Sequence, residues 1–97
     1  MTAREMDLLE GACLTLEQLS SAAALEPGWL IERVQAGLLP ATGASAATWR
    51  FSSAVVLRAR RMREIERAYD AAPELAALVA DLVEEMDALR ERLRRHA

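Results

Sequence analysis

The sequence of 97 residues contains no lysine, a single cysteine and four aromatic residues. One cysteine excludes an internal disulfide framework and a cysteine-rich metal site. A hydrophobic content of 53% with so few aromatics favours helices over a β-sandwich. Twelve arginines against 15 acidic residues give a net charge of -3, whereas DNA-binding domains usually show a basic balance or patch. The net charge therefore argues against a DNA-binding protein but does not exclude one.

The sequence also has no long apolar run. Its longest uncharged stretch, residues 34 to 49, contains glycine and proline and is too polar to span a membrane. The opening residues MTAREMDLLEGACL have acidic residues where a signal peptide needs an apolar core. We therefore expect a cytoplasmic protein that does not contact membranes. Cys13, between two apolar neighbours, is expected to pack as a small buried residue.

Two short helices are predicted between residues 15 and 37. Thr15 and Gln18 have the spacing of a capping box, and apolar residues continue at helical spacing to about residue 24. Pro27 suits the first position of a second helix, and Gly37 suits the left-handed residue that ends it. Two short helices joined by two or three residues form a helix-turn-helix.

The next segment predicts a small β-wing followed by a third helix. Leu38 and Leu39 precede Pro40, a stretch rich in Gly, Ser and Ala, and then TWRF at residues 48–51. This pattern fits two short edge strands with a flexible tip, and Trp49 is expected to pack the wing onto the core. Residues 7 to 14 fit a third short strand. A helix should start at about residue 53 and end before the proline of AAP at 71–73.

Pro73 begins the last predicted helix, which continues to the C-terminus. Its apolar residues alternate at intervals of four and three, as in a coiled coil. They define a heptad seam of six residues: Leu75, Val79, Leu82, Met86, Leu89 and Leu93. A small domain cannot bury so long a seam alone, so we predict a homodimer; packing of the seam on the preceding Arg-rich helix is the alternative. Acidic residues in the first half and arginines at the end favour an antiparallel pair.

The expected organisation is therefore a winged helix-turn-helix domain over residues 1–72 and a dimerisation helix over residues 73–97. Nothing in the sequence indicates catalysis. His96 is penultimate, the carboxylates are spread along helix faces, and no phosphate-binding glycine motif or metal-ligand spacing occurs. We expect no enzyme activity, no cofactor and no metal ion.

The order of the predicted elements resembles the MerR family of winged regulators. Residues 29–39, WLIERVQAGLL, share a Glu at position 32 and the Gly-Leu-Leu ending with the family phrase Thr-x-Arg-Tyr-Tyr-Glu-x-x-Gly-Leu-Leu, although Glu32 lies five residues before Gly37 where the phrase has three. Apolar residues at 29–31 replace the Arg and Tyr positions that contact DNA in that family. The wing tip ATGASAAT has no cation either, although phosphate contacts supply most non-specific DNA affinity. The predicted fold is therefore that of a DNA-binding domain, but its second helix and wing tip lack the cations that would contact phosphate.

One basic stretch remains, with five arginines between residues 58 and 67. They do not share one helix face, which fits a solvated flank paired with nearby acids. The alternative function is a MerR-like transcriptional regulator whose DNA contacts come from this helix through Arg58, Arg61, Arg63 and Arg67.

Three further motifs occur in order along the chain: TWRF at 48–51, Arg-x-x-Arg-Met-Arg at 58–63, and Met-Asp-x-Leu at 86–89. Through them, residues 12 to 95 resemble the chaperone modulator CbpM family, although residues 41–47 are less polar than its usual wing loop. The resemblance implies an adaptor that binds the J-domain of a DnaJ-like (CbpA-type) co-chaperone and restrains its stimulation of the Hsp70 DnaK.

J-domains present a basic helix to Hsp70, so an inhibitor needs an acidic, partly apolar surface. The predicted helix-turn-helix offers such a surface: Glu17, Glu26, Trp29, Glu32 and Arg33. A toxin–antitoxin or anti-sigma type of binder is a third interpretation that the sequence leaves open.

Overall fold

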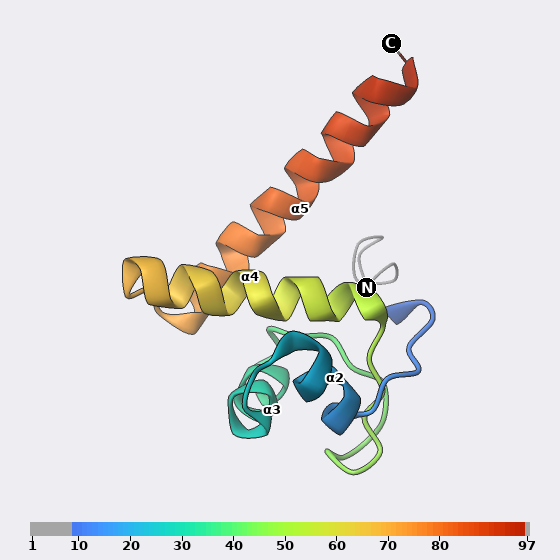
Figure 1. Ribbon diagram of the computed structural model, residues 1–97, viewed down its shortest axis with the longest axis vertical. Helices are drawn as coiled ribbons and strands as arrows, with labels where there is room; N and C mark the ends of the chain where they lie inside the picture. Colours follow the sequence, from blue (N-terminus) through green and yellow to red (C-terminus); the bar gives the residue numbers. More distant parts are fainter. Residues whose placement is uncertain (1–8, 97) are drawn as a thin grey trace. The chain divides into compact units, whose positions relative to one another are not determined.

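The computed structural model describes residues 9–96 (Figure 1). This part of the chain is mainly helical, as predicted, and contains four α-helices: α2 (Leu16–Ala23), α3 (Pro27–Gln35), α4 (Ser53–Tyr69) and α5 (Pro73–His96). The chain forms two compact units, Met1–Arg60 and Arg61–Ala97, so the division falls within α4. The expected functional division after residue 72 stays a prediction.

Helices α2 and α3 pack together in the first unit, and their ends follow the sequence closely. The capping box is present: the Gln18 backbone N–H donates to Thr15 Oγ1 over 3.1 Å, and Thr15 N–H donates to Gln18 Oε1 over 2.9 Å. Ala24 ends α2 in the left-handed conformation, with φ 56°. Pro27 begins α3, and Gly37 follows it with φ 78°, as predicted for the residue that ends this helix.

The predicted wing forms isolated antiparallel bridges in the described residues instead of continuous strands. Thr42 and Arg50 exchange backbone hydrogen bonds of 3.0 and 2.9 Å. Pairing stops there because Pro40 has no N–H to donate and Gly43 turns the chain with φ 103°. The tip closes as a turn in which the Thr48 N–H donates to Ser45 O over 2.9 Å.

The third strand expected over residues 7–14 lies partly outside the described residues. Within them it is a single bridge, between Leu14 and Phe51. The Leu14 N–H donates to Phe51 O over 2.9 Å, and the Phe51 N–H donates to Leu14 O over 2.8 Å. This bridge joins the segment before α2 to the segment before α4.

The core of the first unit is aliphatic around one aromatic pair. Leu19 of α2, Leu30 of α3 and Phe51 are completely buried. Trp49 is also buried and packs edge-on against Phe51, with ring centroids 6.3 Å apart. An edge-to-face pair of this kind adds about 0.5–1.5 kcal/mol beyond its area burial. Trp49 is therefore packed into the core, as expected, and its assignment to a wing stays a prediction.

The expectation that Cys13 is buried was wrong, because its side chain is exposed. Cys13 and Leu14 both donate their backbone N–H to Phe51 O, over 3.0 and 2.9 Å. Side chains alternate between the two faces of an extended segment. Leu14 is half-buried here while its neighbour Cys13 points to solvent. The apolar neighbours of Cys13 did not predict its exposure, because the burial of a side chain in an extended segment depends on which face it lies on and not on the hydrophobicity of adjacent residues.

The second unit consists of the last turns of α4 and the whole of α5. Helix α5 has 24 residues, and three alanines near its start are buried: Ala76, Ala77 and Ala80. An ion pair joins the two helices of this unit, with Arg61 NH2 2.7 Å from Asp87 Oδ2. No helix within residues 9–96 is long and apolar enough to cross a membrane.

Candidate protein-binding surface

Two predicted acidic residues are exposed on α3. Glu26 is the N-cap residue of α3, and its side chain makes no capping hydrogen bond. Its carboxylate lies at the positive end of the helix, where a negative charge is favourable. Glu32 lies farther along the helix, with its side chain 75% exposed. Both carboxylates are therefore accessible to a partner.

Trp29 and Arg33 lie one turn apart on α3 and stack on each other. The Arg33 guanidinium lies 4.4 Å from the centre of the Trp29 ring, within the range of a cation–π contact. Arg33 NH1 also donates to Glu32 Oε2 over 3.0 Å. The Arg33 side chain is only 11% exposed, so its charge is largely covered. The structure thus brings three of the predicted residues together in one α3 cluster, consisting of Trp29, Glu32 and Arg33.

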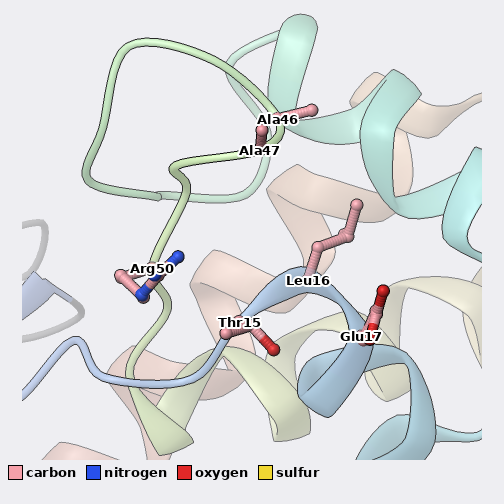
Figure 2. Close-up of a pocket in the computed structure, with 6 residues that line it drawn as sticks. All are labelled: Thr15, Leu16, Glu17, Ala46, Ala47 and Arg50. Carbon is pink, nitrogen blue, oxygen red and sulfur yellow. The ribbon is translucent and has the colours of Figure 1, made fainter.

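Glu17 lies in the first turn of α2 and lines a pocket of about 400 Å³ (Figure 2). The other lining residues come from the N-terminal end of α2 and from the wing: Thr15, Leu16, Ala46, Ala47 and Arg50. Figure 2 shows the Leu16 side chain extending from α2 toward Ala46. The pocket therefore has apolar walls with one carboxylate and one guanidinium.

Arg50 of this pocket was not among the predicted binding residues. Its NH1 donates to Trp49 O over 2.8 Å, and its backbone pairs with Thr42. Glu17 and Arg50 are 33 residues apart, and no local sequence pattern links them. Only the folding of the wing against the start of α2 places both side chains in one pocket.

Arg58, the first arginine of the basic stretch, is a buried structural residue. It is 6% exposed, and its Nε donates to Leu38 O over 3.1 Å. This bond ties α4 to the segment that follows α3. A buried guanidinium engaged with a backbone carbonyl is poorly placed to reach a DNA phosphate.

The other arginines predicted for DNA binding differ in their surroundings. Arg61 pairs with Asp87, and Arg63 NH1 lies 3.7 Å from Glu66 Oε1, whose side chain is 7% exposed. Arg67, in the last turn of α4, is exposed. Three of the four arginines therefore already have polar partners inside their own unit.

Replacing Arg58 by lysine should lower the free energy of unfolding by about 1.5–3 kcal/mol, because a hydrogen bond to a charged group contributes on that order. Lysine keeps the charge but is more strongly hydrated and lacks the planar fork of donors. Arg67→Lys, at the exposed end of the same helix, is the matched control and should stay within about 0.5 kcal/mol. Urea denaturation measures both variants. Equal midpoints for Arg58→Lys and the unmodified chain would show that the bond to Leu38 contributes little.

The heptad seam is largely exposed on α5. Leu75, Leu82, Met86, Leu89 and Leu93 are between 49% and 71% exposed, and Val79 is half-buried. Leu78, beside the seam, is 54% exposed. The single chain therefore does not bury the seam, either on α4 or elsewhere in the described residues.

Within residues 9–96, no group of three or more His, Cys, Asp or Glu side chains is arranged to hold a metal ion. Comparisons with models of protein families, with curated proteins and with solved structures gave no match.

Proposed function

We propose that the chain is a non-catalytic adaptor that binds the J-domain of a DnaJ-like co-chaperone and limits its stimulation of Hsp70. The CbpM resemblance suggests this partner. The observation that carries the proposal is the exposed acidic face of α3, where Glu26 and Glu32 flank the stacked Trp29 and Arg33.

The charge and shape of this face suit a basic helix. Trp29 and Arg33 provide a flat, partly buried platform, and aromatic and arginine side chains are typical anchors of protein interfaces. Glu26 and Glu32 would attract the cations of the partner, which raises the association rate and helps to fix orientation. We assign Glu17 a contact at the edge of the surface, since it lies in the pocket beside the wing.

We further propose that residues 1–72 form a MerR-like winged helix-turn-helix that serves as a protein-binding module. The close pairing of α2 and α3 and the Thr42–Arg50 bridge support this assignment. The absence of charge over residues 41–48 of the wing also suits a protein partner better than a phosphate backbone.

The proposed assembly is a homodimer through α5. The exposed heptad seam supports this assembly, because a long exposed apolar stripe on a monomer usually marks an interface with another protein chain. The protein would then present two J-domain surfaces per dimer. A cytoplasmic location, where co-chaperones of this kind act, stays a prediction.

The alternative is a transcriptional regulator that binds DNA through α4. Three of the four candidate arginines would have to leave their present partners, which are Leu38, Asp87 and Glu66. Titration of the purified chain with a J-domain and, separately, with duplex DNA at low salt distinguishes the two functions. We expect saturable J-domain binding alone. DNA binding that weakens steeply with salt, without J-domain binding, would favour the regulator.

A further inference from the structure

The wing pocket is the cavity of about 400 Å³ between the start of α2 and the wing (Figure 2). Three apolar side chains, one hydroxyl and two opposite charges line it: Leu16, Ala46, Ala47, Thr15, Glu17 and Arg50. Each lining residue is half-buried or exposed, so the pocket is open. Small-molecule sites usually enclose about 70–90% of their ligand, which an open pocket cannot do. The wing pocket therefore suits a side chain that a protein partner inserts.

The two charged groups of the wing pocket are left for a partner. Glu17 and Arg50 form no ion pair with each other, and within residues 9–96 the Glu17 carboxylate has no hydrogen-bond or ion-pair partner. Arg50 NH1 donates to Trp49 O over 2.8 Å. A guanidinium has five N–H donors, so the Arg50 side chain can make further bonds. An occupant that satisfies both groups must carry a cation, an anion and an apolar group.

The wall formed by Ala46 and Ala47 is fixed by contacts of the wing tip itself. Thr48 Oγ1 accepts from the Ser45 N–H over 3.1 Å and donates to Ser45 O over 3.1 Å. Gly43 enters the tip with φ 103°, and a Cβ at this position would lie 2.5 Å from Thr48 O. Glycine is therefore required there. A pocket with a fixed wall costs a partner little ordering when it binds.

The proposed J-domain surface must extend beyond α3. A protein interface of standard size covers about 20–30 residues on each side, whereas α3 has 9 residues. The wing pocket belongs to the same compact unit as α3. Its open charges and apolar wall make it the part of this unit that can add a specific contact to the acidic face.

We infer that the wing pocket takes one apolar side chain of the J-domain, which lies between an acidic and a basic residue of that partner. This inference rests on the proposed function. The basic residue pairs with Glu17 and the acidic residue pairs with Arg50. Glu26 and Glu32 attract basic helices in general, whereas the wing pocket requires a defined order of charges around an apolar residue. Arg50 is therefore a specificity-determining residue of the surface.

Exchanging the two charges of the wing pocket, by Glu17→Arg with Arg50→Glu, tests this order. The exchange leaves the net charge unchanged, so the general attraction of a basic partner is kept. An exposed ion pair changes an affinity by about 1.4- to 5-fold, and a reversal by about the square of that factor. Two reversals should therefore weaken J-domain binding by about 4-fold to nearly 1,000-fold in a calorimetric titration.

Filling the wing pocket, by Ala47→Phe, tests the apolar contact without disturbing the bond between Arg50 and Trp49. Ala47 is exposed, so the larger side chain can be accommodated while it occupies the space that the partner needs. We expect J-domain binding to weaken by about 4- to 100-fold, the range for losing one buried apolar side chain. Ala44→Phe, at an exposed tip position outside the lining, is the matched control and should bind as the unmodified chain does.

The outcomes separate this inference from the proposed function. Weaker binding by both the exchanged and the filled chain, with circular dichroism unchanged, would support it. If the unmodified chain binds the J-domain and both variants bind equally tightly, the inference is overturned and the proposed function stands. Equal losses for Ala47→Phe and Ala44→Phe, with no loss on charge exchange, would also overturn it. A J-domain that does not bind the unmodified chain would contradict the proposed function and this inference with it.

Discussion

Replacing Leu82 and Met86 by alanine should raise the dissociation constant of the proposed dimer about 100- to 10,000-fold. About half of each side chain is exposed in the single chain, 52% and 49% respectively. Full burial of such a side chain contributes about 1.5–3 kcal/mol, so covering the exposed half contributes about 0.8–1.5 kcal/mol. The dimer contains four of these side chains, and their loss removes about 3–6 kcal/mol, or about two to four powers of ten.

Alanine is suited to this test because it keeps the helix while it removes the apolar contact. Leu57→Ala is the matched control, since Leu57 is also 52% exposed but lies on α4, outside the seam. Sedimentation equilibrium over a range of protein concentrations gives the dissociation constant of each variant. If the double variant dimerised as tightly as the Leu57→Ala control, another surface would have to hold the two copies together.

Reversing the charges of Glu26 and Glu32 together, by Glu26→Lys and Glu32→Lys, should weaken J-domain binding by up to about 1,000-fold. An exposed ion pair contributes up to about 1 kcal/mol, and reversal turns this attraction into a repulsion of similar size. Two reversals therefore cost up to about 4 kcal/mol, which corresponds to up to about three powers of ten in affinity. The loss should be greatest at low salt, where surface charges are least screened.

The control for charge reversal changes the net charge equally at other exposed sites. Glu10→Lys with Glu64→Lys also raises the net charge by four, and neither residue belongs to α2 or α3. This variant should bind the J-domain almost as well as the unmodified chain. If both double variants lost the same affinity, only the overall charge would matter, and the binding surface would have to be sought elsewhere. Circular dichroism on each variant checks that the helices are retained.

The helices were predictable from the sequence because their signals are local. The capping box of Thr15, the proline at position 27 and the left-handed glycine at position 37 act within one turn of the residues they organise. The break between α4 and α5 is equally local, since Pro73 disfavours helical geometry in the residue before it. These elements have nearly the ends that their residues indicate.

The wing and the pocket were less predictable because they depend on contacts between distant residues. The β-propensity of residues 38–51 does not reveal that pairing is limited to Thr42 and Arg50. Nor does it reveal that Arg50 lies in one pocket with Glu17. The burial of Arg58 against Leu38 O also depends on a contact between distant residues. From the sequence alone, a run of arginines on a helix indicates a solvated face.

Only some of the candidate binding residues could be placed next to one another from the sequence alone. Spacing along one helix places Trp29 and Arg33 four residues apart, where side chains on a helix meet, and they stack as a result. Glu17 comes from another helix, and its relation to this cluster depends on tertiary packing. Its assignment to the binding surface is therefore independent of that of Glu26 and Glu32.

The most direct test of the proposed function is calorimetric titration of the chain with the J-domain of a DnaJ-like co-chaperone from the same organism. The proposal predicts saturable binding with a dissociation constant of about 1 µM or lower, equivalent to at least about 8 kcal/mol. It also predicts one J-domain per chain and no heat with duplex DNA at low salt. Absence of J-domain binding, together with salt-sensitive DNA binding that needs the exposed Arg67, would contradict the adaptor function and assign the activity to α4.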